Sequence, residues 1–346
     1  MRVPEPRGEA SSALLGYLRR PGDGAAPASR LDRASRALAA QPGDPVTDED
    51  LQLTLLLCYE LHYRGLEGVD DSLEWDPLVI AARRRLEDRF ATGLAAALAV
   101  VDDGGPIDRE LTALVAAESG PGTGPPLSSY VRRWATLSEV REFVVHRSIY
   151  QLKEADPHSW GIPRLTGRAK AALVEIQVDE YGGGRPERMH ATLFAATMRA
   201  LGLDDTYGAY VDVVPAVTLA TTNAISMFGL NRRRRGALVG HLAAFEMTSS
   251  LPNGRYGDGL RRLGFDRTAT EFFDVHVEAD AVHEQIAAVD LCGGLLATEP
   301  HLRADVLLGA ATALYLDARA SAHLYDAWQA QRTSLRTPVR TQDVCA

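Results

Sequence analysis

The sequence predicts an all-α protein. From Leu31 onward, apolar residues recur at helical spacing almost everywhere, and we find no convincing run of alternating apolar and polar residues that would indicate strands. Residues that cap or break helices punctuate this pattern, as at Asp76-Pro77 and in the loop 120–126, which is rich in glycine and proline. We find no internal repeat and no low-complexity tract.

The composition argues against several classes of protein. The net charge is −9, and an acidic balance disfavours nonspecific binding to nucleic acid. No apolar run approaches the roughly 20 residues of a membrane span, and the first residues lack the apolar core of a signal peptide. Cys58, Cys292 and Cys345 are scattered and odd in number, which fits a reducing cytoplasm. We therefore expect a cytoplasmic protein that binds neither nucleic acid nor membranes.

Breaker residues divide the chain into four segments. Residues 1–28, rich in proline, glycine, serine and charge, are expected to be poorly ordered in part. The loop 120–126 places a boundary between an N-terminal helical region, residues 29–135, and a second helical domain, residues 136–332. Residues 333–346 form a C-terminal tail.

In the N-terminal region, Thr47 is a plausible N-cap for a helix that carries Leu51, Leu55 and Cys58 and ends near Gly65. Asp76-Pro77 begins an amphipathic helix that runs to about residue 98, and residues 106–119 form another.

In the second domain, Thr136 and Glu139 form a capping box that begins a helix ending near Ala155. Asp204 or Asp205 is expected to cap a helix that Pro215 kinks, and the glycine-rich segment 252–259 is expected to be a loop able to cover a pocket. Further helices are expected at about 165–181, from 185 onward, at 233–249, around 268–290 and at 302–329.

The stretch 272–283 carries the first candidate for chemistry. His276, Asp280 and His283 lie four and three residues apart, so they share one helical face. Phe272 and Phe273 make the segment apolar enough to be buried, and buried ionisable groups need a partner. A metal ion is the simplest partner; the alternative is a solvated polar face.

Three further candidates lie on the preceding helices. Glu154 falls near a helix end, Glu180 continues the apolar stripe of the helix 165–181, and His190 follows about a turn into the next helix. Together with His276, Asp280 and His283, they give three carboxylates and three imidazoles. This set contains no cysteine, which favours iron or manganese over structural zinc, and six ligands suit two metal ions better than one.

Other polar residues near these positions are expected to be solvent-exposed or structural and not to be metal ligands. Glu175 and Asp179 lie off the apolar stripe and are expected to be solvated. His241 and Glu246 lie five residues apart and share a helical face poorly, so a direct metal role is disfavoured for both. His158 follows Pro157, which turns the chain, and is expected to support the site or the fold.

With these motifs, residues 138–330 resemble the haem-oxygenase-like diiron oxidases and oxygenases, also described as iron-containing redox enzymes. The resemblance is carried by residues 152–158, by residues 175–184 with His190, and by His276-x3-Asp280-x2-His283. It implies a seven-helix haem-oxygenase-like bundle that binds no haem, here preceded by an N-terminal helical extension. It also implies two iron ions held by these motifs, O2 as cosubstrate, and one of Glu154 and Glu180 as a bridging carboxylate.

The resemblance further implies a reaction on a small molecule, either N-oxygenation of an amine or oxidative C–C cleavage of an amino or fatty acid, in specialised metabolism. Electrons would come from an external reductant or from the substrate. Some relatives use an N-terminal helical region to form homodimers, and Leu51, Leu55 and Cys58 are one possible face for this, although they are equally suited to packing on the core.

Two alternatives remain from other functional classes. One is a noncatalytic helical protein that binds a ligand or a partner. The other is a metal-free hydrolase of the thiaminase-like branch, which needs a nucleophilic cysteine; Cys292, after the last ligand-bearing helix, is the candidate.

Overall fold

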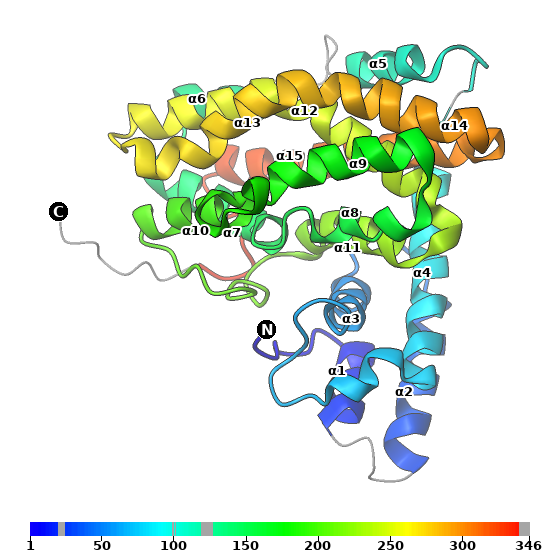
Figure 1. Ribbon diagram of the computed structural model, residues 1–346. Helices are drawn as coiled ribbons and strands as arrows, with labels where there is room; N and C mark the ends of the chain where they lie inside the picture. The colour runs from blue at the N-terminus through cyan, green and yellow to red at the C-terminus, as the bar shows by residue number, and fades with distance from the viewer. Residues whose placement is uncertain (20–24, 99, 101, 119–126, 339–346) are drawn as a thin grey trace.

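The all-α prediction is confirmed. The computed structural model describes residues 1–19, 25–98, 100, 102–118 and 127–338, except for the side chains of 278–282, and these ranges contain helices and turns but no β-strand. Figure 1 shows α1, α2 and α3 with one end of α4 in a lower part of the molecule, and α9, α12, α13 and α15 in an upper part.

Four helices build the lower part: α1 (Glu9–Arg19), α2 (Ala25–Ala39), α3 (Glu49–Glu60) and α4 (Pro77–Ala97). The Asp76 carboxylate accepts hydrogen bonds from the backbone N–H groups of Leu78 and Val79, which confirms the predicted start of α4. Helix α3 begins one residue later than predicted, because Asp48 rather than Thr47 accepts the N–H of Leu51.

The segment expected to be poorly ordered contains helix α1. Leu14 and Leu18 are fully buried, and Asp50 at the start of α3 accepts the backbone N–H groups of Ala10 and Ser11. This long-range docking could not be inferred from local composition, because the partners lie about 40 residues away in the sequence. The remainder of that segment includes residues 20–24, which lie outside the described ranges.

The upper part holds the remaining helices. They are α5 (Ile107–Glu118), α6 (Leu127–Arg133), α7 (Leu137–Gln151), α8 (Asp156–Ser159), α9 (Gly167–Glu180), α10 (His190–Ala200), α11 (Ala216–Leu230), α12 (Arg235–Arg262), α13 (Arg267–Gln285), a π-helical turn (Ile286–Gly293), α14 (Gly294–Thr298) and α15 (Arg303–Gln329).

The helix expected to be kinked at Pro215 instead begins after it. Residues 203–215 form turns, and α11 starts at Ala216. Asp204 caps a turn by accepting the N–H of Thr206, and Pro215, which has no N–H, occupies the N-cap position of the helix.

The loop expected at 252–259 is part of helix α12, which continues through Pro252. Its glycines serve close packing: a Cβ at Gly259 would lie 2.8 Å from the carbonyl oxygen of Val131 on α6. Packing of α12 against α6, α13 and α15 therefore outweighs the local preference of proline and glycine for a loop. The expected loop is therefore wrong, although Pro252, Asn253 and Tyr256 of this helical segment do line a cavity.

The hydrophobic core is continuous between the two parts. One buried cluster includes Leu57 of α3, Val144 of α7 and Phe272 of α13. The predicted boundary loop, 120–126, lies outside the described residues. Leu51, Leu55 and Cys58 are buried inside the chain, so they pack on the core and are not available as a dimer face.

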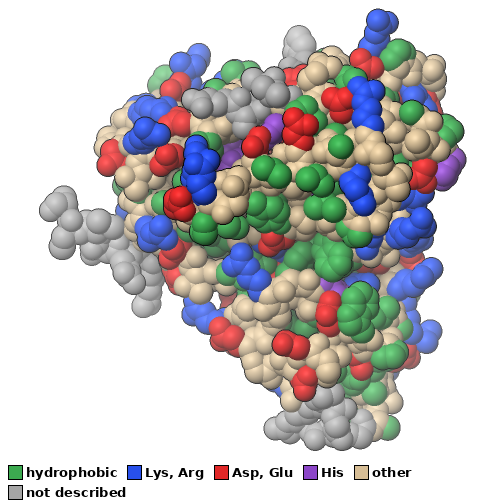
Figure 2. Space-filling view, viewed as in Figure 1, with side chains coloured by type: hydrophobic (Ala, Val, Ile, Leu, Met, Phe, Trp, Pro, Cys, Tyr) green, Lys and Arg blue, Asp and Glu red, His purple; other side chains and the backbone are tan. Residues whose placement is uncertain are grey.

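The surface carries charges of both signs (Figure 2), and the described part of the C-terminal tail contacts the body of the protein. Figure 2 shows Lys and Arg side chains interspersed with Asp and Glu over the viewed face. In the predicted tail, Ser334 bonds to Glu142 on α7, whereas residues 339–346 lie outside the described part of the chain. Within the described residues, every helix is too short or too polar to cross a bilayer.

Candidate metal centre

The turn between α7 and α8 positions Glu154. The capping box of Thr136 and Glu139 begins α7 as predicted, but the helix ends at Gln151, so Glu154 lies in a turn and not on the helix. The next residue, Ala155, has a φ of 73°. The Glu154 side chain is only 8% exposed and faces the interior of the upper part.

A sharp reversal brings Glu180 and His190 together. Glu180 is the last residue of α9 and His190 the first of α10. Gly182, with a φ of 66°, begins the reversal, and a Cβ there would lie 2.7 Å from the backbone nitrogen of Met189. The glycine-rich segment therefore allows Oε2 of Glu180 and Nδ1 of His190 to approach within 3.0 Å.

Helix α13 supplies two histidines whose ring orientations are fixed by hydrogen bonds. Nδ1 of His276 donates to the carbonyl of Phe272 at 2.7 Å, so Nε2 is directed towards Glu154, 3.6 Å away. Nε2 of His283 donates to Asp179 at 3.0 Å, which leaves Nδ1 facing Glu246 at 3.3 Å. A carboxylate or carbonyl that orients a histidine in this way is a regular feature of metal sites.

These side chains form two groups that share Glu180. In each group one potential ligand atom per residue lies within 4.8 Å of the others. The groups are Glu154, Glu180, His190 and His276, and Glu180, Glu246 and His283. The predicted stripe on α13 is thus divided between the two groups.

Asp280 lies in α13, but its side chain is outside the described part of the structure. Glu246 was disfavoured by the sequence because only its spacing from His241 was considered. Its partner is on another helix, a relation that spacing along one helix cannot reveal. Asp179 was expected to be solvated; it is 59% exposed and yet orients His283.

The donor atoms fit a metal ion. Among the described residues, Oε2 of Glu154 and Nδ1 of His190 and His283 are buried and make no hydrogen bond, although each has an oppositely charged group within 4.0 Å. Close approach without hydrogen-bond alignment is expected where lone pairs converge on a common point. Carboxylate oxygens and imidazole nitrogens suit iron or manganese.

The electrostatics of the two groups are coupled. Burial raises the pKa of Glu154, whereas for Glu180 the neighbouring histidines outweigh burial and lower the pKa. Burial alone would lower the pKa of His283, but Glu246 and Asp179 raise it to about 9. Without a metal, protons on the histidines thus balance the buried carboxylates.

His241 and His158 form a separate pair. Nε2 of His158 lies 3.4 Å from Nδ1 of His241, and both are fully buried against Phe245. Burial lowers the pKa of His158 to about 4 and holds that of His241 well below its usual value, so both rings are neutral. Within the described residues His241 belongs to neither metal-binding group.

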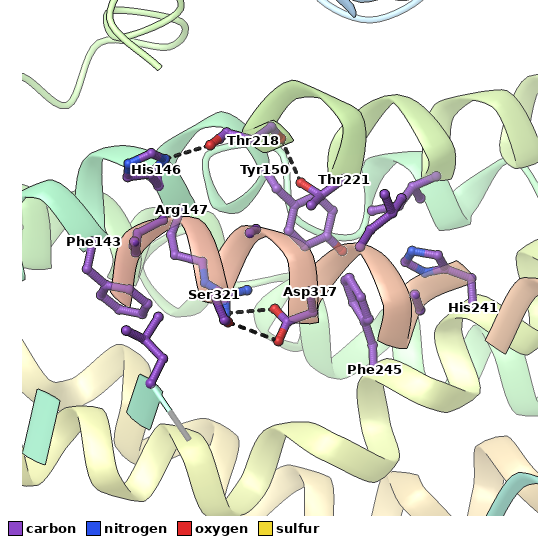
Figure 3. A pocket seen from close by; sticks show the side chains of 16 residues that line it. Phe143, His146, Arg147, Tyr150, Thr218, Thr221, His241, Phe245, Asp317 and Ser321 are labelled. Atoms are coloured by element: carbon purple, nitrogen blue, oxygen red, sulfur yellow. Dashed lines mark hydrogen bonds and ion pairs between the residues drawn. The ribbon is translucent and has the colours of Figure 1, made fainter. Parts of the chain in front are cut away.

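A cavity of about 870 Å³ adjoins the groups. Its walls include Glu154, Glu180 and His276, together with Arg147 and Asp317, whose side chains form an ion pair at 3.0 Å. Figure 3 shows Arg147, Tyr150 and Asp317 in a smaller adjoining pocket, with Asp317 bonded to Ser321. The cavity offers both charged and apolar contacts to a small molecule beside the metal-binding groups.

Comparison with known proteins agrees with this geometry. Residues 141–318 match the sequence profile of a family described as iron-containing redox enzymes. A stretch of 137 residues, 39% of the chain, is 29% identical to nitrosourea synthase from Streptomyces achromogenes subsp. streptozoticus. That match spans 29% of the length of the relative.

Proposed function

Because this chain belongs to the iron-containing redox enzyme family, an oxidoreductase family of haem-oxygenase-like all-α fold, we propose that it is an O2-dependent diiron enzyme acting on a small amine. The observation that carries the proposal is the pair of ligand groups that share Glu180. A single metal site would not need two histidine-containing groups that share one carboxylate.

The shared carboxylate supports one division of the ligands between two irons. Glu154, His190 and His276 would hold one iron, and Glu246 and His283 the other. Glu180 would bridge, because a carboxylate between two cations offsets their repulsion. Asp280, on the same helix as both α13 histidines, would complete the carboxylate set. When bound, the irons would supply electrons to O2, with an external reductant or the substrate as the source of those electrons.

The chain's own residues prepare the site for this chemistry. The carbonyl of Phe272 and the carboxylate of Asp179 hold the two α13 histidines in the tautomers that turn their lone pairs inward. Apolar residues such as Phe194 and Phe272 line the cavity and limit the access of water.

The cavity favours a charged substrate. The Arg147–Asp317 ion pair presents a carboxylate that can receive an ammonium group and a guanidinium that can receive a carboxylate. N-oxygenation is also supported by the relative, because a nitrosourea carries an oxidised nitrogen. C–C cleavage of an amino or fatty acid would be recognised as a different product in the test below.

The two alternatives have less support. The thiol of Cys292 is fully buried and lies 3.8 Å from the carbonyl of Val239, and burial raises its pKa, which disfavours a nucleophilic thiolate. A noncatalytic binding protein would not need buried donors aligned on two common points.

The proposal is tested by anaerobic loading with Fe(II), exposure to O2, and mass analysis of products from candidate amines, amino acids and fatty acids. We expect O2 consumption that an amine accelerates and a product heavier by one or more oxygen atoms at nitrogen. Loss of carbon from an amino or fatty acid would indicate C–C cleavage. Failure of the folded chain to bind iron would contradict the diiron assignment.

A further inference from the structure

A buried ion pair lies directly behind the Glu154 turn. The ammonium of Lys153 bonds to Glu60 at the end of α3, and both side chains are only 1% exposed. The other oxygen of Glu60 accepts the hydroxyl of Tyr207 at 2.6 Å, and the ammonium lies 4.3 Å from the centre of the Tyr63 ring. Both charges are therefore fully engaged, and the pair links the lower part of the molecule to the turn.

Consecutive residues belong to the ion pair and to the metal-binding group: Lys153 is part of the pair, and Glu154 is part of the group. Lys153 projects towards α3, whereas the Glu154 carboxylate faces His190 and His276. Because adjacent residues share one peptide unit, the buried and anchored Lys153 side chain restrains the backbone from which the Glu154 side chain projects. The position of the carboxylate is thus tied to Glu60, 93 residues away in the sequence.

Two further hydrogen bonds fix the backbone of this turn. The guanidinium of Arg64 donates to the carbonyl of Leu152 at 2.9 Å, and the amide of Gln177 donates to the carbonyl of Ala155 at 2.9 Å. The positive φ of Ala155 is strained for a residue with a Cβ, and such a conformation persists only where its surroundings determine it. The turn lies outside a helix and depends on these contacts for its shape.

Stability alone does not account for the pair. Removing two charges from water costs much of what their attraction gains, and replacing a buried pair by neutral side chains often leaves stability unchanged. A lysine and a glutamate that are both 1% exposed therefore call for another explanation, and their attachment to a ligand-bearing turn supplies one.

We propose that the Glu60–Lys153 pair is a positioning device that sets the Glu154 carboxylate for metal binding. On this view the N-terminal helical region forms part of the metal centre, since α3 determines where a ligand of the first iron lies. The inference rests on the proposed function, in which Glu154 holds that iron.

The test compares two paired variants with the native chain. Glu60→Gln/Lys153→Met removes both charges and leaves no stranded ion. The matched control, Glu87→Gln/Arg83→Met, neutralises another buried pair of the lower part, whose side chains are 2% and 9% exposed and which bonds to Tyr59 but not to the turn. Each pair is placed in a His283→Ala background, so that only the group containing Glu154 is titrated with Fe(II) under argon.

We expect the first variant to bind Fe(II) at least about tenfold more weakly, the effect typical of residues that orient metal ligands. The control should stay within about twofold of its parent at similar unfolding temperature. Equal affinity in the folded Glu60→Gln/Lys153→Met variant, or an equal loss in the control, would overturn the inference and leave the diiron assignment intact. A native chain that binds no iron would overturn both.

A gentler variant keeps the test decisive if the paired one does not fold. Tyr207→Phe deletes only the hydroxyl that Glu60 accepts, and it should weaken Fe(II) binding about threefold, because the carboxylate loses one of its two fixed partners. Unchanged affinity in Tyr207→Phe, when the paired variant cannot be studied, would overturn the inference.

Discussion

The two carboxylates nearest the centre of the site respond to their surroundings in opposite directions. Glu154, whose pKa is raised by burial, lies farther from its histidine partners than Glu180, whose pKa is lowered because His190 and the other histidines outweigh burial. His190 has a raised pKa, because Glu180 outweighs the burial that would lower it. In the metal-free protein, protons therefore occupy the positions that metal ions would take.

This competition predicts that metal affinity rises with pH. The pKa of His283 is raised from 6.5 to about 9, so its imidazolium stabilises the metal-free fold at low pH, and this contribution is lost as the pH rises through about 9. Metal binding needs the neutral ring, so affinity should increase by up to about tenfold per pH unit below 9. Titration with Co(II) between pH 6 and 8.5 measures this slope.

Asp179→Asn provides the control for the pH prediction. It removes one of the two carboxylates that raise the pKa of His283, so this pKa should fall and the slope should become shallower at high pH. An affinity that does not depend on pH in the native chain would contradict the proton competition.

Alanine substitutions test the ligand set. Glu180→Ala and His190→Ala should reduce activity by at least about 100-fold, more than is usual for residues that only orient ligands, and should leave most helicity intact. His241→Ala should be milder, because that ring contacts His158 and Phe245 outside both groups. Turnover and circular dichroism measure the two effects. If His241→Ala proves as damaging as His190→Ala, the ligand set is incomplete.

For individual site residues, the sequence predicted relations within one helix better than contacts between side chains on different helices. His276 and His283 were found from their spacing, and Glu180 from its place on an apolar stripe. Glu246 and Asp179 were assigned weaker roles because their partner, His283, lies on another helix. Only the packed structure supplies that relation.

Among the helices, α13 contributes a histidine to each of the two groups. It carries His276 and His283, and its C-terminal end continues into the π-helical turn Ile286–Gly293, an irregularity often found at functional sites. Metal ions would add ligand bonds to the two histidines that this helix carries.

We predict that α13 is held more loosely without metal. A helix of this length depends mostly on tertiary packing, so protection of residues 268–290 from hydrogen exchange should increase on Fe(II) loading under argon. Helix α4 provides the comparison, because it packs in the lower part away from both groups and should change less. Equal protection of 268–290 in both states would show that the site is preformed, and the ligand assignment would stand.

The helix ends show which structural features can be predicted from neighbouring residues in the sequence alone. Asp76-Pro77 and the capping box of Thr136 and Glu139 were predicted correctly, because a cap is a contact between residues two or three apart. Pro252 and Gly259 were interpreted as a loop, yet they lie inside α12, where the backbone of α6 approaches Gly259 too closely for a larger side chain. Packing between distant segments decides such positions.

For the whole molecule, the expected homodimer has to use a surface other than Leu51, Leu55 and Cys58, which are buried within the chain. We predict a solution mass about twice the 37.4 kDa of one chain. Sedimentation equilibrium at micromolar concentration, with and without Fe(II), measures it. A monomer under both conditions would contradict the predicted homodimer and would leave the proposed metal centre unaffected.

The two groups also predict how many iron ions the whole chain binds. The native chain should bind two Fe(II) ions, and His283→Ala should bind one, because the group of Glu154, Glu180, His190 and His276 remains. His190→Ala should keep the ion held by Glu246 and His283 and lose affinity at the other position. Glu180→Ala should weaken both, since both groups share this carboxylate.

Thermal unfolding provides a second measurement of how many metal positions are occupied in each variant. A ligand that binds only the folded state stabilises it by about 2.7 kcal/mol at 100 times its dissociation constant, so two occupied sites should raise the unfolding temperature more than one. The native chain should therefore gain the most from Fe(II), His283→Ala and His190→Ala less, and Glu180→Ala least. Saturation of the native chain at one ion, with the same stabilisation in His283→Ala, would contradict a second metal position, because the group containing His283 would then contribute no binding.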